Sequence, residues 1–294
     1  MVIKITRLGF TESALLCLYW TKTHTNIGKT LIWSDKHSEY KNNTIKWLYT
    51  TSGYYDNSVT ASYFDAKHDD DTDPLVYSTY MERVMNFIKG SDICCLCFSD
   101  FKKIENNNVE EFIRYISAKK YCNITPEITF QFMTNNKNVL IISPFADLAK
   151  EQYVSGNLEK IHGELLSPKV DNLYTYTFPY TFFNKGEHNN ILEQADFTFS
   201  DILKSIDSNL YDGVLINCGA YSCIIGEKMT NIGKNICIMG GLFSSAFGIL
   251  TNRRRQYLKT IGTLITNEEY WITKIPDKYK PQDYMKIEGG CYWD

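Results

Sequence analysis

Short apolar runs alternate along this chain with segments of helical periodicity. Runs that are apolar almost throughout are typical of strands covered on both faces of a sheet. They predict buried strands at residues 92–100, 139–142, 212–218 and 235–239. Runs richer in β-branched and aromatic residues predict further strands at residues 2–6, 44–57 and 171–184.

Helical segments follow most of these runs. We predict helices at residues 12–20, 76–89, 109–118, 146–153, 201–210 and 222–232. Thr11 and Ser200 are the predicted N-caps of the first and fifth helices, and Gly233 is the left-handed stop of the last. The alternation predicts an α/β fold with a Rossmann-like, mostly parallel sheet and helices on both faces. We expect one domain over residues 1–294, with insertions in the first half at about residues 51–90.

Composition narrows the classes of protein to which the chain can belong. The net charge is −3, so no global basic field favours nucleic acid. The nine cysteines form no regular framework, and Cys94, Cys95 and Cys97 are expected to be buried apolar thiols. No leader pattern and no long apolar run are found, so we expect a cytoplasmic protein without a membrane span. The 21 tyrosines suit a pocket for sugars or bases, although compositional drift is the alternative.

Two glycine-rich turns stand at predicted strand ends. Ligands of open parallel sheets bind beyond the carboxyl ends of the strands. A glycine turn that opens a helix lets backbone N–H groups approach a diphosphate. The donor-binding candidates in these turns are Gly219, Ala220, Tyr221, Ser222, Gly240 and Gly241. Tight packing of strand against helix is the alternative, since the dinucleotide fingerprint GxGxxG is absent.

Charged side chains near other strand ends offer catalytic and phosphate-binding groups. Arg7 suits a bidentate contact to phosphate, and Glu12, just beyond Gly9, suits a base, a contact to a sugar hydroxyl or a metal ligand. The other candidates are the carboxylates of Asp147 and of the acidic loop 69–73, which ends in Asp73, and the guanidinium groups of Arg253 and Arg254. For all of them a solvated surface charge or a helix-dipole contact is the alternative reading.

Four stretches together carry a resemblance to a known family. Along the chain they are "ITRLGFTESALL", "VLIISPFADLAKEQY", "YDGVLINCGAYSCIIGEKMTNIGKNICIMGGLFSSAFGI" and the terminal "KIEGGCYWD". Nearly the whole chain resembles a family of α/β proteins from bacterial polysaccharide loci and from large DNA viruses that glycosylate their own capsids. It is also distantly similar to glycosyltransferases of the GT-D type. Residues 212–249 are the most specific part of the resemblance.

The resemblance implies transfer of a sugar from a nucleotide donor. The GT-D turn combines an Arg, a Gly and an Asp-x-Glu metal motif. Arg7, Gly9 and Glu12 match it, but Phe10 stands where the Asp would be. A Mn²⁺ or Mg²⁺ cofactor is therefore an open expectation, and its ligands stay unassigned.

The resemblance also implies where the donor would lie. The family's Gly-aromatic loop falls on Gly53, Tyr54 and Tyr55, and its Pro-Phe turn on Ser143, Pro144 and Phe145. Tyr54, Tyr55 and Tyr221 are the candidate aromatic walls for a sugar. The base that would take the acceptor proton is Glu12, Asp147 or an Asp of residues 69–73, and the sequence leaves this choice open.

Two hypotheses from different classes follow. The first is a hexosyl- or pentosyltransferase that uses a nucleoside diphosphate sugar, expected to be a UDP-sugar such as UDP-xylose, on a glycan or glycoprotein acceptor. The second is a nucleotide-binding protein that transfers no sugar, or an assembly protein of a glycan pathway. Slow hydrolysis of the donor without an acceptor distinguishes a transferase from a binding module.

Overall fold

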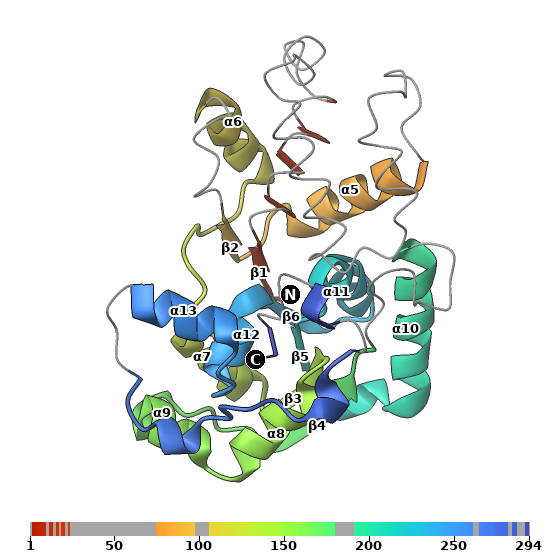
Figure 1. Ribbon diagram of the computed structural model, residues 1–294. Coiled ribbons are helices and arrows are strands. Elements are labelled where there is room, and N and C mark those ends of the chain that lie inside the picture. Colours follow the sequence, from red (N-terminus) through yellow and green to blue (C-terminus); the bar gives the residue numbers. More distant parts are fainter. Residues whose placement is uncertain are drawn as a thin grey trace.

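A sheet of six parallel strands organises the computed structural model of this protein (Figure 1). The structure describes residues 2–9, 12, 13, 16, 17, 19, 20, 23, 75–97, 106–179, 191–260, 265–281, 284–286, 292 and 293. The strands are β1 (Lys4–Leu8), β2 (Ile93–Leu96), β3 (Asn138–Ser143), β4 (Asn172–Thr177), β5 (Gly213–Ile216) and β6 (Asn235–Ile238). Their order across the sheet is β2-β1-β6-β5-β3-β4. The predicted α/β, Rossmann-like fold is confirmed.

Helices connect the strands and cover the sheet. They are α5 (Leu75–Ile88), α6 (Asn106–Ile116), α7 (Pro126–Asn136), α8 (Ala146–Val154), α9 (Asn157–His162), α10 (Ile191–Ser205), α11 (Ser222–Asn231), α12 (Phe243–Ala246) and α13 (Asn252–Thr260). The short 3₁₀ turns η5 (Gly219–Tyr221) and η6 (Gly240–Leu242) lead into α11 and α12. The described residues between positions 12 and 20 are also helical, as predicted, and Thr23 is helical beyond the predicted range.

Alternate side chains of the strands fill two cores, one on each face of the sheet. Leu140 and Ile142 of β3 belong to the core that includes side chains of α5, α6, α10 and α11. Val139 and Ile141 belong to the core that includes side chains of α7, α8, α9 and α12. All four are fully buried, which explains why this strand is apolar at every one of these positions. Figure 1 shows α5, α10 and α11 grouped on one side of the sheet.

The predicted start of one helix is wrong. Ser200 does not cap a helix, because α10 begins nine residues earlier, at Ile191. The Ser200 hydroxyl instead donates to the carbonyl of Asp196, one turn back in the same helix. Ile191, Ala195 and Ile202 recur at helical spacing on the buried side of α10, and this periodicity outweighs the local capping signal of one serine.

The helices α7, α9 and α13 are not among those predicted from the sequence. The sequence does contain a signal for the start of α7, namely Thr125 followed by Pro126. In the structure Thr125 is the N-cap and accepts from the N–H of Ile128, and Pro126 takes the first helical position. The helix α9 has only six residues and starts after Gly156, whose φ is 73°. The predicted strand at 44–57, and the part of the predicted insertion before Leu75, lie outside the described residues.

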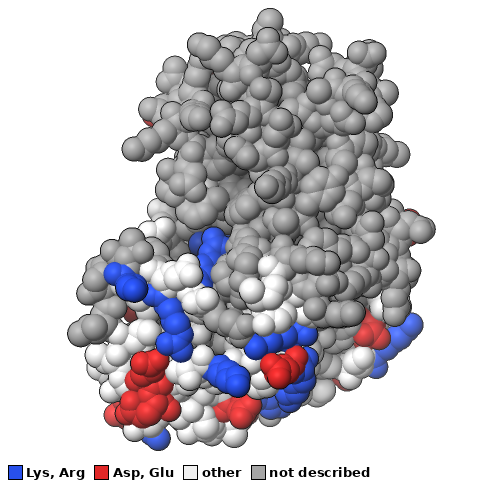
Figure 2. All heavy atoms as spheres, viewed as in Figure 1, with Lys and Arg blue, Asp and Glu red and all other residues white. Residues whose placement is uncertain are grey.

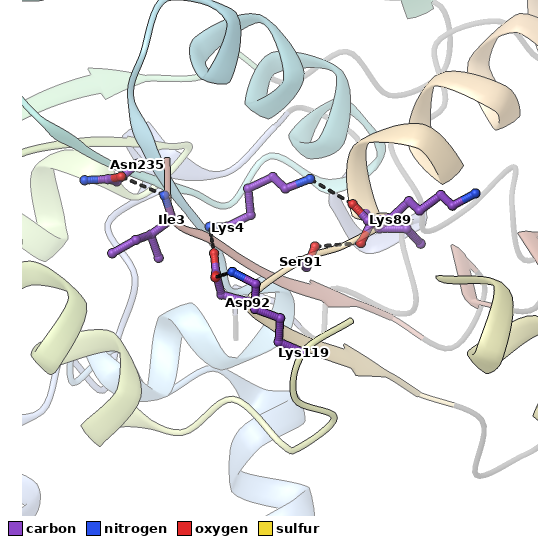
Figure 3. Close-up of polar contacts among 8 residues, drawn as sticks. Ile3, Lys4, Lys89, Ser91, Asp92, Lys119 and Asn235 are labelled. Carbon is purple, nitrogen blue, oxygen red and sulfur yellow. Dashed lines mark hydrogen bonds and ion pairs between the residues drawn. The ribbon is translucent and has the colours of Figure 1, made fainter. Parts of the chain in front are cut away.

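A charged network lies where β1 and β2 begin, at the end of these strands opposite the glycine turns. Figure 3 shows this network. The carboxylate of Asp92 accepts from the backbone N–H of Lys4 at 2.9 Å and pairs with Lys119 at 2.6 Å. The Lys4 ammonium donates to the carbonyls of Phe87 and Lys89, at the end of α5. Burial alone would raise the pKa of Asp92, but the bonds from Lys119 and Lys4 outweigh it and lower that pKa.

We expect Asp92→Asn to lower the free energy of unfolding by about 1 kcal/mol at neutral pH, since it weakens a charge-assisted link between β1 and β2. A carboxyl whose pKa is lowered in the folded state stabilises above its unfolded pKa, and this stabilisation is lost as pH falls through the folded value. The difference in the free energy of unfolding between wild type and variant should therefore shrink below about pH 4. Urea unfolding at pH 7 and pH 3 measures it, with the exposed Asp171→Asn as control. A difference that persists unchanged at pH 3 would contradict the ionic explanation.

Candidate functional site

The carboxyl ends of β1, β6 and β5 lie side by side at one edge of the sheet. In the register of the sheet, Thr6 pairs with Ile238 and Ile216 pairs with Ile238 from the other side. The turn after β5 begins at Gly219 and the turn after β6 at Gly240, so the two glycine-rich turns are neighbours. Arg7 is the last residue but one of β1 and therefore lies at the same edge.

The backbone conformation favours glycine in both turns. Gly219 has a φ of 58° and Gly240 a φ of 54°, which is the left-handed region that other residues enter at a cost. Gly219 and Gly241 are exposed, whereas the residues that follow Gly219 are buried. What these turns offer at the surface is therefore mainly backbone, as a backbone cradle for an anion requires.

The side chain of Arg7 lies against Gly240. A Cβ at position 240 would stand 2.7 Å from Nη1 of Arg7, which is closer than real contacts of this kind. Arg7 is half-buried, and within the described part of the chain no hydrogen bond or ion pair engages its guanidinium group. A half-buried guanidinium beside a glycine turn is well placed to bind a phosphate or a carboxylate.

Glu12 curls back over the turn that follows β1. Its Oε2 would be 2.5 Å from a Cβ at Gly9, so a larger residue at position 9 would make this carboxylate shift. Arg7 near the end of β1 and Glu12 in the turn that follows thus lie at the same edge of the sheet. The thiol of Cys97 lies just beyond the end of β2, and the charges of both residues reach it. The charge of Arg7 lowers the pKa of this thiol and the charge of Glu12 raises it.

Ser13 is a residue of this turn that the sequence analysis missed. It is fully buried, and its N–H donates to the carbonyl of Gly9 at 3.0 Å. Its hydroxyl accepts from the N–H of Cys97 at 3.1 Å and so links the ends of β1 and β2. The contact joins residues 84 positions apart, so no local sequence pattern predicts it.

The side chains of the first glycine turn support it from inside the protein. Tyr221 is 1% exposed and its ring lies 5.1 Å from that of Phe178. The hydroxyl of Ser222 accepts from the N–H of Cys218 at 3.1 Å, and the carbonyl of Ala220 accepts from Tyr80 Oη at 2.9 Å. In this structure Tyr221 presents no open face to a ligand, so its role as an aromatic wall stays a prediction.

The Pro-Phe turn after β3 has a similar internal role. The buried hydroxyl of Ser143 accepts from the N–H of Phe145 at 3.1 Å and from the amide of Asn217 at 3.5 Å. Phe145 packs edge-on against Tyr279, with ring centroids 6.4 Å apart. Of this turn only Pro144 is half-buried rather than buried. Ser143 therefore holds the ends of β3 and β5 in place, and direct donor contact by Ser143 or Phe145 stays a prediction.

No contact among the described residues places the remaining candidates beside Arg7 or Glu12. Asp147 is exposed and accepts from Thr177 Oγ1 at 2.9 Å, beside β4. Because β4 lies four strands from β1, about 19 Å separates the two strands. Arg253 donates to Tyr292 Oη and lies over its ring, and Arg254 is half-buried on α13. Gly53, Tyr54 and Asp73 lie outside the described residues.

Three further observations concern the surface charge, the metal-ligating and cysteine side chains, and the helices of the described residues. Figure 2 shows the face of the molecule seen in Figure 1, and basic and acidic side chains are interspersed over its described part. Among the described residues, no three His, Cys, Asp or Glu side chains gather as a metal site, and none of the eight described cysteines is in a disulfide. Within the same residues, no helix has the length and apolar character needed to cross a membrane.

Comparisons with known proteins give no match for this chain. No protein-family model, curated protein sequence or solved structure matches it. The functional argument accordingly rests on the residues at the carboxyl edge of the sheet. Arg7, Glu12 and the backbone of the two glycine turns form the candidate site.

Proposed function

We propose that the protein is a glycosyltransferase that moves a sugar from a nucleoside diphosphate donor to a glycan acceptor. The observation that carries the proposal is the guanidinium of Arg7 beside Gly240, at the edge where two glycine turns meet. A leaving diphosphate needs positive charge and hydrogen-bond donors aimed at its oxygens. Arg7 supplies the charge, and the exposed backbone at Gly219 and Gly241 supplies N–H groups.

Glu12 is the proposed base for the acceptor hydroxyl. Of the two candidate carboxylates that the structure describes, Glu12 follows the strand that carries Arg7. A base must lie near the departing phosphate to take the acceptor proton, and the turn over Gly9 holds this carboxylate at the same edge. Asp147 lies beside β4 and is less well placed for this role.

The finer assignments are part of the same proposal. We propose a UDP-sugar as donor, with UDP-xylose as the first sugar to test, and a glycan or glycoprotein acceptor in the cytoplasm. A nucleotide-binding protein without transferase activity would use the same phosphate contacts. Hydrolysis of the donor in the absence of acceptor separates the two, because only a transferase polarises the bond to the sugar.

A thermal-shift experiment tests the donor site directly. We expect UDP to raise the melting temperature more than GDP, CMP or TDP, each with and without Mn²⁺. A ligand that binds only the folded state adds roughly 2.7 kcal/mol of stability at a hundredfold excess over its Kd. Arg7→Gln should lose the shift, whereas Arg114→Gln, an exposed arginine on α6, should keep it. No shift with any of the four nucleotides would overturn the proposed donor site.

A further inference from the structure

Asn217 places a polar side chain directly after β5, a strand whose four residues are all buried. Its backbone N–H still donates to the carbonyl of Ile142 at 2.8 Å, so the pairing of β5 with β3 fixes its position. The side chain itself is half-buried. Asn217 therefore lies at the carboxyl end of a parallel strand, where ligands of open parallel sheets bind.

Asn217 and Arg7 lie on the same face of the sheet. Side chains alternate between the two faces along a strand. Leu215 and Ile5 both belong to the core on the side of α7 and α8. Asn217 and Arg7 each come two positions later in their strands, so both are on that same face. The donor site proposed at Arg7 and the amide of Asn217 are thus on one side of the sheet.

The strand β6 separates the two side chains. It lies between β1 and β5, so about 10 Å separates the two outer strands. In the register of the sheet, Thr6, Ile238 and Ile216 form one row, and Arg7 and Asn217 follow that row at the same height. A nucleoside diphosphate carries its base at one end and its diphosphate at the other, and it is long enough to span this width.

The terminal amide of Asn217 keeps hydrogen-bonding capacity for a ligand. Its Nδ2 donates to Ser143 Oγ at 3.5 Å, a long bond that turns the nitrogen toward β3. Among the described residues, no group donates a hydrogen bond to Oδ1 of Asn217. An amide has two N–H donors and one carbonyl acceptor. One donor and one acceptor therefore stand side by side on a planar group.

We infer that Asn217 binds the base of the donor nucleotide and selects uracil. The inference rests on the proposed function, because it takes the diphosphate to lie at Arg7. Uracil presents an N–H donor at N3 beside a carbonyl acceptor at O4. Oδ1 of Asn217 accepts from N3 and Nδ2 donates to O4, a two-point contact like those by which Asn recognises base edges in nucleic acids. Cytosine has an acceptor at N3 and an amino donor at the next position, so it meets the same amide orientation with the wrong polarity.

Other parts of the nucleotide use this amide less fully. Ionised phosphate oxygens only accept hydrogen bonds, so they would leave Oδ1 of Asn217 without a partner. Arg7 also supplies a positive charge that a neutral amide lacks. A ribose hydroxyl can pair with the amide, but it is the same in every ribonucleotide and gives no selection between bases. A preference between two pyrimidines is therefore the property that distinguishes a contact to the base.

Titration calorimetry with UDP and CDP on the full chain tests the inference. The two ligands share the ribose and the diphosphate, so the ratio of their Kd values isolates the contact to the base. We expect the wild type to bind UDP about tenfold more tightly than CDP. Equal affinities for UDP and CDP would overturn the inference and leave the donor site in place. Binding of neither nucleotide would overturn the donor site together with the inference.

Two substitutions at position 217 measure the contact itself. Asn217→Ala removes both bonds and should weaken UDP binding about tenfold, with little effect on CDP. Asn217→Asp keeps the shape, but its carboxylate repels O4 of uracil and accepts from the amino group of cytosine, so the preference for UDP should disappear or reverse. Asn135→Asp makes the same chemical change at an exposed position of α7 and should keep the wild-type preference.

Arg7→Gln separates the contact to the base from the contact to the diphosphate. It should weaken UDP and CDP by the same factor and so leave the ratio of their Kd values unchanged. Circular dichroism verifies that each variant is folded. A folded Asn217→Ala or Asn217→Asp that keeps the wild-type ratio would show that the amide only links β3 to β5, and the inference would be wrong while the donor site at Arg7 stands.

Discussion

Replacing Glu12 with Gln is expected to lower the rate of donor hydrolysis by about 10³-fold while the melting temperature stays that of the wild type. A positioned general base contributes about 10² to 10⁴ in rate, and an amide cannot accept the proton. Gln has nearly the same shape as Glu, so the fit of residue 12 over Gly9 should be kept. The initial rate of sugar release from a UDP-sugar, measured with and without acceptor, gives the effect.

A second carboxylate provides the control. Asp147→Asn alters the bond to Thr177 beside β4 and leaves the turn after β1 untouched. If Asp147→Asn abolishes activity and Glu12→Gln does not, the base must be reassigned to Asp147. Wild-type activity in Glu12→Gln with an unchanged melting temperature would remove Glu12 from the reaction altogether.

Replacing Gly240 with Ala is expected to weaken UDP binding by about tenfold or more and to lower the free energy of unfolding by about 1 kcal/mol. The loss of stability comes from the left-handed backbone, with φ at 54°, which costs a residue with a Cβ roughly 1–2 kcal/mol. The loss of binding has another cause: the new Cβ would stand 2.7 Å from Nη1 of Arg7 and displace the guanidinium. A charge-assisted hydrogen bond is worth about 1.5–3 kcal/mol, which corresponds to at least a tenfold loss.

Gly233 is a matched control for the backbone effect. It has a φ of 82°, a Cβ added to it would meet no atom within 4 Å, and it ends α11 away from Arg7. Gly233→Ala should therefore lower stability by a similar amount and leave UDP binding unchanged. Urea unfolding and titration calorimetry measure the two quantities separately. If Gly240→Ala binds UDP as tightly as Gly233→Ala does, Arg7 does not hold the donor in the proposed way.

Local signals account for the elements that the sequence predicts well. The apolar run at 139–142 lies within β3, and Gly233 ends α11 as predicted: its N–H donates to Thr230 and that of Lys234 to Met229. These features depend on residues close together in the chain. Ser200 gives a misleading signal because nearby apolar residues at helical spacing continue α10 through it. The start of α7 is readable from Thr125 and Pro126, although it is not among the predicted helices.

The sequence by itself determined the α/β class, the positions of most strands and the turns at their carboxyl ends. Periodicity and turn chemistry decide these features over a few residues. Only the tertiary structure decided that β1 lies between β2 and β6, which brings Arg7 to Gly240 and to Cys95 and keeps Asp147 beside β4. It also decided that Tyr221 packs inward on Phe178. Strand order depends on how the two faces of the whole sheet are covered, and no short stretch of sequence contains that information.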